Sequence, residues 1–245
     1  MRSYDRSFDG LRPVKFTVGY CDYPAGSVLI ETGKTRVLCN ATVEERVPPH
    51  LLGTESGWVT AEYSMLPAAT QTRNRRDISS MKLSPRSAEI QRLVGRSLRS
   101  VTDLNALTGM TITVDCDVLQ ADGGTRTASI TGGWLALWLA CEKLRKEGVL
   151  KTNPVKEEVA AVSAGIVDGE VLLDLDYSED SRAEADFNMI MTASGRIIEL
   201  QGTGEERPFS RAELNRLLHY RVELVALCKC LVNRDGYGRL AFGRM

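Results

Sequence analysis

Short apolar runs that alternate with polar residues and end at turn residues predict β-strands in two parts of the chain. In the first part the pattern breaks at Pro24-Ala25-Gly26 and again at Gly33-Lys34, so a hairpin is expected to turn on Gly33. The second part follows the middle of the chain. The predicted strands cover residues 14–20, 26–32, 35–43, 58–66, 111–120, 159–167, 170–176, 186–193 and 196–203.

Three longer segments carry apolar residues at helical spacing. The first opens with Ser84-Pro85, an N-cap residue followed by proline at the first helical position, and the third opens at Ser210 with a capping box to Glu213. We expect the third helix to run to about Asn233. The predicted buried face of the first helix is Ile90, Leu93, Val94, Leu98 and Val101, and that of the second is Ile130, Trp134, Leu137, Trp138, Cys141 and Leu144.

Helices placed between runs of strands predict a single α/β or α+β domain, residues 1–245, in which mixed sheets carry packed helices. The last dozen residues contain three glycines and little periodicity, so a loose tail is predicted from about residue 234. The segments GSVLIE (26–31) and GEVLLD (169–174) are similar, which leaves an internal duplication open.

The composition mainly excludes some classes of function. With 31 Lys plus Arg against 32 Asp plus Glu the net charge is −1, so any site for an anionic partner must be local. The longest apolar run, 134–141, is too short to cross a bilayer, and the polar amino terminus predicts a cytoplasmic protein. The six cysteines are scattered among apolar residues, as expected for reduced core thiols.

Familiar catalytic motifs are missing. The two histidines, His50 and His219, lie beside no candidate nucleophile, and neither a Walker A motif nor GxGxxG is present. This excludes ordinary triads, zincin sites and P-loop or dinucleotide sites, and three other features remain.

The first feature is ADGGTRTAS (121–129), where two glycines stand between a strand and a helix. Glycine permits close backbone approach, and the amides at the helix start are free. Thr125 and Arg126 add a hydroxyl and a guanidinium, and together these groups favour a phosphate. The alternative is a tight turn with Thr125 or Thr127 as N-cap.

The second feature is Arg86, which also falls in the first turn of a predicted helix. A cation at a helix amino terminus opposes the helix dipole, so Arg86 and Arg126 together suggest a clamp on one anion if the two helix starts converge. The alternative is a surface arginine paired with Glu89 or Asp77.

The third feature is the acidic segment YSEDSRAEADFN (177–188). Asp180 and Asp186 flank a short loop before a strand, which could place two carboxylates on one Mg²⁺. The alternative is a solvated acidic turn.

Charge is also polarised along the chain. The segment 73–99 holds eight cations and two anions, so it carries +6 and the rest of the chain −7. Arg92, Arg96 and Arg99 recur at helical spacing, which suits either RNA phosphates or a subunit contact.

These residues together resemble the ribonuclease PH family of phosphorolytic 3′ exoribonucleases over nearly the whole chain. The motifs that carry the resemblance are LRPVKF, GSVLIETGKTRVLCNATVEERVPP, GWVTAEYSMLP, EIQRLVGRSLRSV, DVLQADGGTRTASITG, DLDYSEDSRAEADFN and ELQGTGEERPFS. One departure is Pro85 in SPRSAEIQR, where the family pattern has glycine.

The resemblance implies an α+β fold of the ribosomal protein S5 domain 2-like type. It also implies inorganic phosphate as co-substrate, Mg²⁺ or Mn²⁺ as cofactor, RNA as partner, chiefly transfer RNA precursors with ribosomal RNA processing alongside, and a hexamer built as a trimer of dimers. It places phosphate binding at Arg86, Gly124, Thr125 and Arg126, and metal binding and catalysis at Asp180 and Asp186. The expected RNA contacts are Arg73, Arg75, Arg76, Arg92, Arg96 and Arg99.

Two other functions stay open at this point: a non-catalytic RNA-binding ring subunit of the exosome type, and a small-molecule phosphotransferase that shares the S5-like fold. The first should lack one of the proposed site residues, and all are present. The second should show a nucleotide-binding glycine loop, and only the short GGTRT is found.

Overall fold

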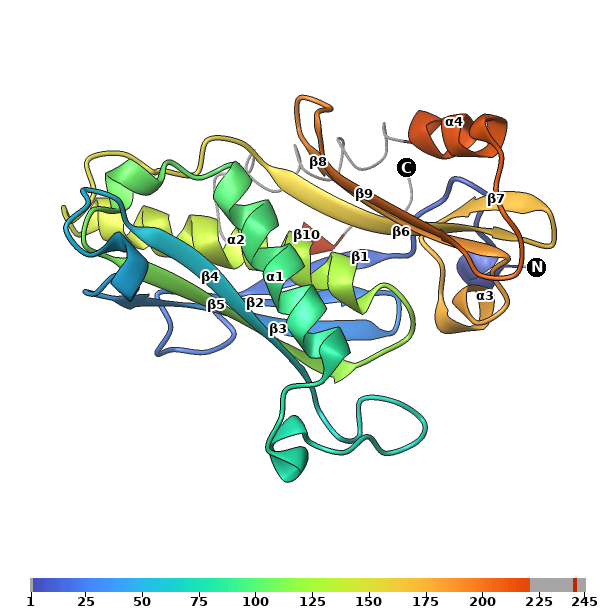
Figure 1. Ribbon diagram of the computed structural model, residues 1–245, viewed down its shortest axis with the longest axis horizontal. Helices are drawn as coiled ribbons and strands as arrows, with labels where there is room; N and C mark the ends of the chain where they lie inside the picture. The colour runs from blue at the N-terminus through green and yellow to red at the C-terminus, as the bar shows by residue number, and fades with distance from the viewer. Residues whose placement is uncertain (1, 221–239, 242–245) are drawn as a thin grey trace.

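The computed structural model describes residues 2–220 and 240–241, which form two β-sheets with helices packed against them (Figure 1). The first sheet is antiparallel except for the parallel pair β4–β5. Its strands, in spatial order, are β10 (Leu240–Ala241), β1 (Val14–Val18), β2 (Gly26–Thr32), β3 (Thr35–Glu44), β5 (Thr111–Gln120) and β4 (Trp58–Met65).

The second sheet is antiparallel throughout and is drawn in yellow to orange in Figure 1. Its strands, in spatial order, are β7 (Glu170–Leu173), β6 (Val159–Val167), β8 (Ala185–Thr192) and β9 (Ile197–Gly204).

The α-helices are α1 (Pro85–Ser100), α2 (Thr125–Lys146), α3 (Tyr177–Asp180) and α4 (Arg211–His219). Short 3-10 helices cover Ser3–Asp5, Pro49–Leu51, Asp77–Ser80 and Leu104–Leu107. Helix α1 packs on β4, whereas α2 packs on β2 and β3 and also reaches β6. Helix α2 therefore joins the two sheets.

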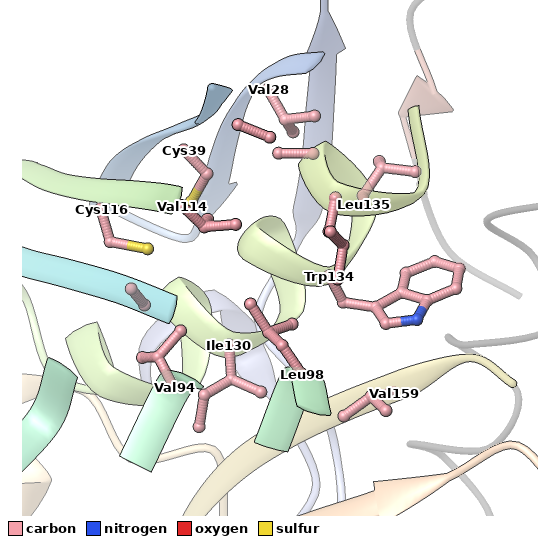
Figure 2. Close-up of a cluster of buried hydrophobic side chains, with 14 of the residues drawn as sticks. Val28, Cys39, Val94, Leu98, Val114, Cys116, Ile130, Trp134, Leu135 and Val159 are labelled. Atoms are coloured by element: carbon pink, nitrogen blue, oxygen red, sulfur yellow. The ribbon is translucent and has the colours of Figure 1, made fainter. Parts of the chain in front are cut away.

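The main core lies where α1 and α2 meet the first sheet. Figure 2 shows Val28, Cys39 and Val114 of that sheet on one side of α2, and Ile130 of α2 on the other side beside Val94 and Leu98 of α1, with Val159 of the second sheet nearby. A Cβ at Gly132 would lie 2.7 Å from Ile30 Cγ2, so α2 approaches the sheet closely only because this residue is glycine.

A smaller core lies between the second sheet and α4. It contains Phe187 and Met189 of β8 and Leu217 of α4, and the ring of Phe209 meets Phe187 edge-on at a centroid distance of 4.6 Å. The capping box predicted at Ser210 and Glu213 is confirmed and fixes the start of α4.

Most predicted elements are confirmed. The hairpin pairs Thr32 with Thr35 across Gly33, and Ser84 caps α1 by accepting a hydrogen bond from the Ser87 amide. The predicted strand 170–176 is too long, because β7 ends at Leu173 and Asp174 has a positive φ of 54°.

The predicted continuation of the last helix beyond residue 220 lies outside the described residues. So does the predicted tail, apart from Leu240 and Ala241, which pair with β1. Within the described residues, no helix is both long enough and apolar enough to cross a membrane. The organisation as one domain stays a prediction.

Candidate active site

The glycine loop between β5 and α2 has the backbone that an anion site needs. Gly123 and Gly124 both adopt left-handed conformations, with φ of 77° and 68°. Gly124 itself is the N-cap of α2, and no side chain accepts a hydrogen bond there. The predicted alternative of a Thr125 or Thr127 cap is therefore wrong, since Thr127 donates its hydroxyl back to the Gly124 carbonyl. Among the residues that the structure describes, no side chain accepts from the amides at the start of α2.

Arg126 lies in the first turn of α2 and is held from two sides. Its Nη1 donates to Glu89 Oε1 at 3.2 Å and to Gln201 Oε1 at 3.1 Å. Glu89 belongs to α1 and Gln201 to β9. The sequence offered Glu89 as a partner for Arg86, but the fold pairs it with Arg126 instead.

The starts of α1 and α2 converge, since Arg126 in the first turn of α2 donates to Glu89 of α1. The Tyr63 hydroxyl lies 2.9 Å from Thr125 Oγ1 at the same place. Burial raises the pKa of Tyr63, while a hydrogen bond with Thr125 and the charges of Arg86 and Arg126 act in the opposite direction. Burial also raises the pKa of Asp180, and the same two arginines oppose that rise. Both guanidinium groups therefore lie within electrostatic reach of one phenol and one carboxylate, as a phosphate clamp requires.

Asp180 and Asp186 form the acidic side of the site. Partial removal from water raises the pKa of Asp180, and repulsion by Asp186 raises it further. Asp186 Oδ1 is buried and has no hydrogen-bond partner among the described residues. Two adjacent carboxylates, one with an unsatisfied buried oxygen, fit a divalent cation that completes its shell with water and substrate oxygens. No described group of three or more His, Cys, Asp or Glu side chains is gathered for a metal.

The other acids of this region are already neutralised by arginines that the sequence analysis did not single out. Arg2 binds Glu179 at 2.7 Å, and Arg12 binds Asp174 at 2.7 Å. Arg6 lies 3.2 Å from Glu179 and 3.9 Å from Asp176, and Arg207 pairs with Glu184. Within the described part of the chain, Asp180 and Asp186 are the members of this acidic group that lack an arginine partner. Three of these four arginines, Arg2, Arg6 and Arg12, lie among the first twelve residues, and this cluster is the sequence signal that could have pointed to the ion pairs.

The predicted RNA-binding arginines divide into two groups. Arg73, Arg75 and Arg76 are exposed on the long loop between β4 and α1, which projects from the body of the molecule in Figure 1. Arg92 is exposed too, in a groove that Glu89 and Gln201 also line. None of these four makes an ion pair with a residue that the structure describes.

Arg96 and Arg99 are held within the chain. Arg96 Nη2 lies 2.6 Å from Glu199 Oε2, and Arg99 stacks over the Trp58 ring at 4.4 Å and donates to the Val59 carbonyl. Tertiary contacts within the chain therefore occupy Arg96 and Arg99, and RNA binding by these two residues stays a prediction.

Comparison with known proteins identifies the chain. The family model described as the 3′ exoribonuclease family, domain 1, matches residues 10–141, and that of domain 2 matches residues 157–223. The chain belongs to the 3′ exoribonuclease family. The predicted membership of the ribonuclease PH family and the predicted α+β fold are thus confirmed.

Similar relatives cover almost the whole chain. The Ribonuclease PH of Syntrophomonas wolfei is 54% identical over 235 residues, which are 94% of this chain and 98% of that protein. The Ribonuclease PH of Bacillus subtilis is 58% identical over 219 residues, which are 89% of each.

Solved structures share the fold at much lower identity. The Archaeoglobus fulgidus exosome with RNA bound to the active site superposes with a TM-score of 0.78 at 21% identity, covering 94% of this chain and 91% of that one. A chain of an archaeal exosome core gives a TM-score of 0.70 at 20% identity, covering 92% and 87%.

Proposed function

We propose that this protein is a phosphorolytic 3′ exoribonuclease of the ribonuclease PH type. The observation that carries the proposal is that Arg86 and Arg126 lie within electrostatic reach of Asp180 and its neighbour Asp186. The glycine loop before α2 packs against the same acidic segment at Leu175 and Asp176. A site that is cationic on one side and acidic on the other suits an anionic nucleophile and a cation-bound phosphodiester.

Inorganic phosphate is the proposed nucleophile. Arg86 and Arg126 hold it between their guanidinium groups, and the Gly124 amide with the Thr125 amide and hydroxyl orients its oxygens at the helix start. The Glu89 carboxylate that now accepts from Arg126 is 48% exposed, so an incoming phosphate can replace it at little cost.

The proposed reaction exchanges one phosphorus–oxygen bond for another. A phosphate oxygen attacks the last phosphodiester of an RNA 3′ end in line and forms a phosphoanhydride. The bond to the 3′ oxygen of the preceding nucleotide breaks, and that oxygen takes up the proton that the attacking hydrogen phosphate loses. The products are a nucleoside diphosphate and RNA shortened by one residue. Water is not consumed, so nucleoside diphosphates should drive the reverse extension.

Asp180 and Asp186 are the proposed ligands of Mg²⁺ or Mn²⁺. When bound, the ion neutralises charge on the scissile phosphate and on the leaving oxygen. Within residues 2–220, the chain contributes by pairing the acidic neighbours with arginines while these two carboxylates make no ion pair.

RNA is proposed to lie along Arg73, Arg75, Arg76 and Arg92, where exposed guanidinium groups can neutralise backbone phosphates. To contact RNA, Arg96 would have to leave Glu199, and Arg99 would have to leave the Trp58 ring. We therefore propose that these two arginines stabilise this surface and do not bind RNA themselves. Transfer RNA precursors are the proposed substrates. A cytoplasmic hexamer, a trimer of dimers, is the proposed assembly.

The test is release of nucleotides from a 3′-labelled RNA with Mg²⁺, with and without inorganic phosphate. Phosphate-dependent release of nucleoside diphosphates is expected, and added nucleoside diphosphates should extend the RNA. Release of monophosphates would mean hydrolysis and refute the mechanism. RNA binding without release would instead favour a non-catalytic ring subunit.

A further inference from the structure

Arg12 is a fully buried arginine that joins the phosphate loop to the acidic side of the site. Its side chain is 0% exposed and donates in two directions. Nη1 donates to the Asp122 carbonyl at 2.5 Å and Nη2 to the Gly123 carbonyl at 3.5 Å. Nε and Nη2 donate to the two oxygens of Asp174 at 3.1 and 2.7 Å. One planar group therefore holds two segments that lie far apart in the sequence.

Asp174 begins the backbone path to Asp180. It is 3% exposed, and its φ of 54° turns the chain from β7 towards α3. The next residues lie directly against the glycine loop, since a Cβ at Gly123 would come 2.5 Å from the Leu175 carbonyl oxygen. Asp176 then caps α3, which ends at Asp180.

We propose that Arg12 and Asp174 are positioning residues that set the phosphate loop and the Asp180 carboxylate in register with each other. Among the described residues, Arg12 is the side chain that hydrogen-bonds both segments. Arg12 holds the Asp122 carbonyl, and it shares the Gly123 carbonyl with the Thr35 hydroxyl, which donates to that oxygen at 2.7 Å. These contacts fix the carbonyls of the loop and thereby the start of α2. This inference rests on the proposed phosphate site.

The guanidinium group suits this task for a geometric reason. Its planar fork can face Asp174 on one side and the two carbonyls on the other, whereas a lysine ammonium is a single point of charge. Burial lowers the pKa of Arg12, but the charge and hydrogen bonds of Asp174 more than offset this, and the pKa is raised. Arg12 therefore stays charged and takes no part in proton transfer, and because its side chain is fully buried it touches no substrate.

Arg2 supplies a matched control. It is also buried, and it binds the same acidic segment through Glu179 and the Leu173 carbonyl. It makes no hydrogen bond to the described residues of the glycine loop. In Figure 1 the blue 3-10 helix Ser3–Asp5 lies beside α3, consistent with these contacts. Arg2→Lys and Arg12→Lys therefore both loosen the acidic segment, but only Arg12→Lys removes the link between that segment and the phosphate loop, which then keeps its hydrogen bonds with Thr35.

The experiment measures steady-state phosphorolysis and the rise in melting temperature on titration with inorganic phosphate, for the full chain and both variants. For Arg12→Lys we expect the KM for phosphate to rise about 10- to 100-fold, because a small displacement of positioned groups has effects of this size. The KM for RNA should stay unchanged, and the stabilisation by phosphate should shift to higher concentration. Arg2→Lys should keep the wild-type phosphate dependence at a similar loss of melting temperature.

The inference is overturned if Arg12→Lys keeps the wild-type KM for phosphate, or if both variants change it equally. If Arg12→Lys does not fold, Asp174→Asn is compared with Arg2→Lys instead, because it keeps the size of the side chain but removes its charge. The inference is then overturned if Asp174→Asn keeps the wild-type KM for phosphate, or if both variants change that KM equally. A wild-type protein that phosphate neither stabilises nor activates would refute the proposed function, and this inference with it.

Discussion

On the face of the first sheet that points away from the helices, the carboxyl group of Asp115 should make the free energy of unfolding depend on pH. Asp115 and Asp117 alternate along β5 with the buried Val114 and Cys116, so they point away from the helices. Glu62 of β4 is in register with Asp115. Partial burial, followed by repulsion from Glu62 and Asp117, raises the pKa of Asp115 from 3.8 to about 6.

This raised pKa fixes the sign of the pH dependence. The folded state holds the Asp115 proton more tightly than the unfolded chain, so the stabilising contribution of Asp115 is complete below about pH 4. It is lost as the pH rises through about 6. A pKa difference of this size corresponds to about 3 kcal/mol. Because the carboxyl is only partly buried and solvent screens its neighbours, we expect about 1 kcal/mol.

Asp115→Asn should therefore be more stable than the wild type by about 1 kcal/mol at pH 7, and this advantage should shrink towards pH 4. Urea unfolding at a fixed protein concentration, repeated between pH 4 and 8, measures the difference. Glu62→Gln should recover part of the effect by lowering the pKa of Asp115. Thr113→Asn, a neutral change on the same strand and face, should leave the pH dependence unaltered. A stability difference that is constant with pH, or that grows as the pH falls, would refute the reasoning.

Three further predictions concern the site. Arg126→Ala should raise the KM for phosphate about 10- to 100-fold, the effect of losing charge-assisted hydrogen bonds, with the KM for RNA unchanged in initial-rate measurements. Asp186→Asn should abolish phosphorolysis while RNA binding stays measurable by filter retention, and an active variant would remove this residue from the site. Gly123→Ala should lower the melting temperature much more than Gly169→Ala. Both glycines have a φ of 77°, but an added Cβ meets the Leu175 carbonyl only at Gly123, and nothing lies within 4 Å of it at Gly169. Equal melting temperatures would show that the loop moves aside.

Local signals determined much of the architecture. Ser84 before Pro85, and the pairing of Ser210 with Glu213, set helix starts through contacts within one turn, so neighbouring residues contain the information. The same holds for Gly123 and Gly124, whose left-handed backbone is a property of glycine itself.

The motifs of the ribonuclease PH family also located the candidate site residues along the chain. Arg86, Arg126 and Asp180 lie on separate motifs, and the fold brings them within electrostatic reach of one another.

Ion-pair partners were decided by tertiary structure alone. Glu89 was expected near Arg86 because the two are close in sequence, yet it accepts from Arg126 of another helix. Helical spacing predicted a ribbon of arginines, but a spacing rule does not show that Trp58 lies beneath Arg99.

The same limit applies to the buried pair of Arg12 and Asp174, which are 162 residues apart. The sequence by itself determined the strands, the helix starts and the glycine loop, because these depend on near-neighbour sterics and hydrogen bonds. Only the tertiary structure decided which charges neutralise each other, because a long side chain can reach any partner that the fold brings within a few ångströms. That choice leaves Asp180 and Asp186 without arginine partners among the described residues, and it therefore separates the structural acids from the proposed catalytic ones.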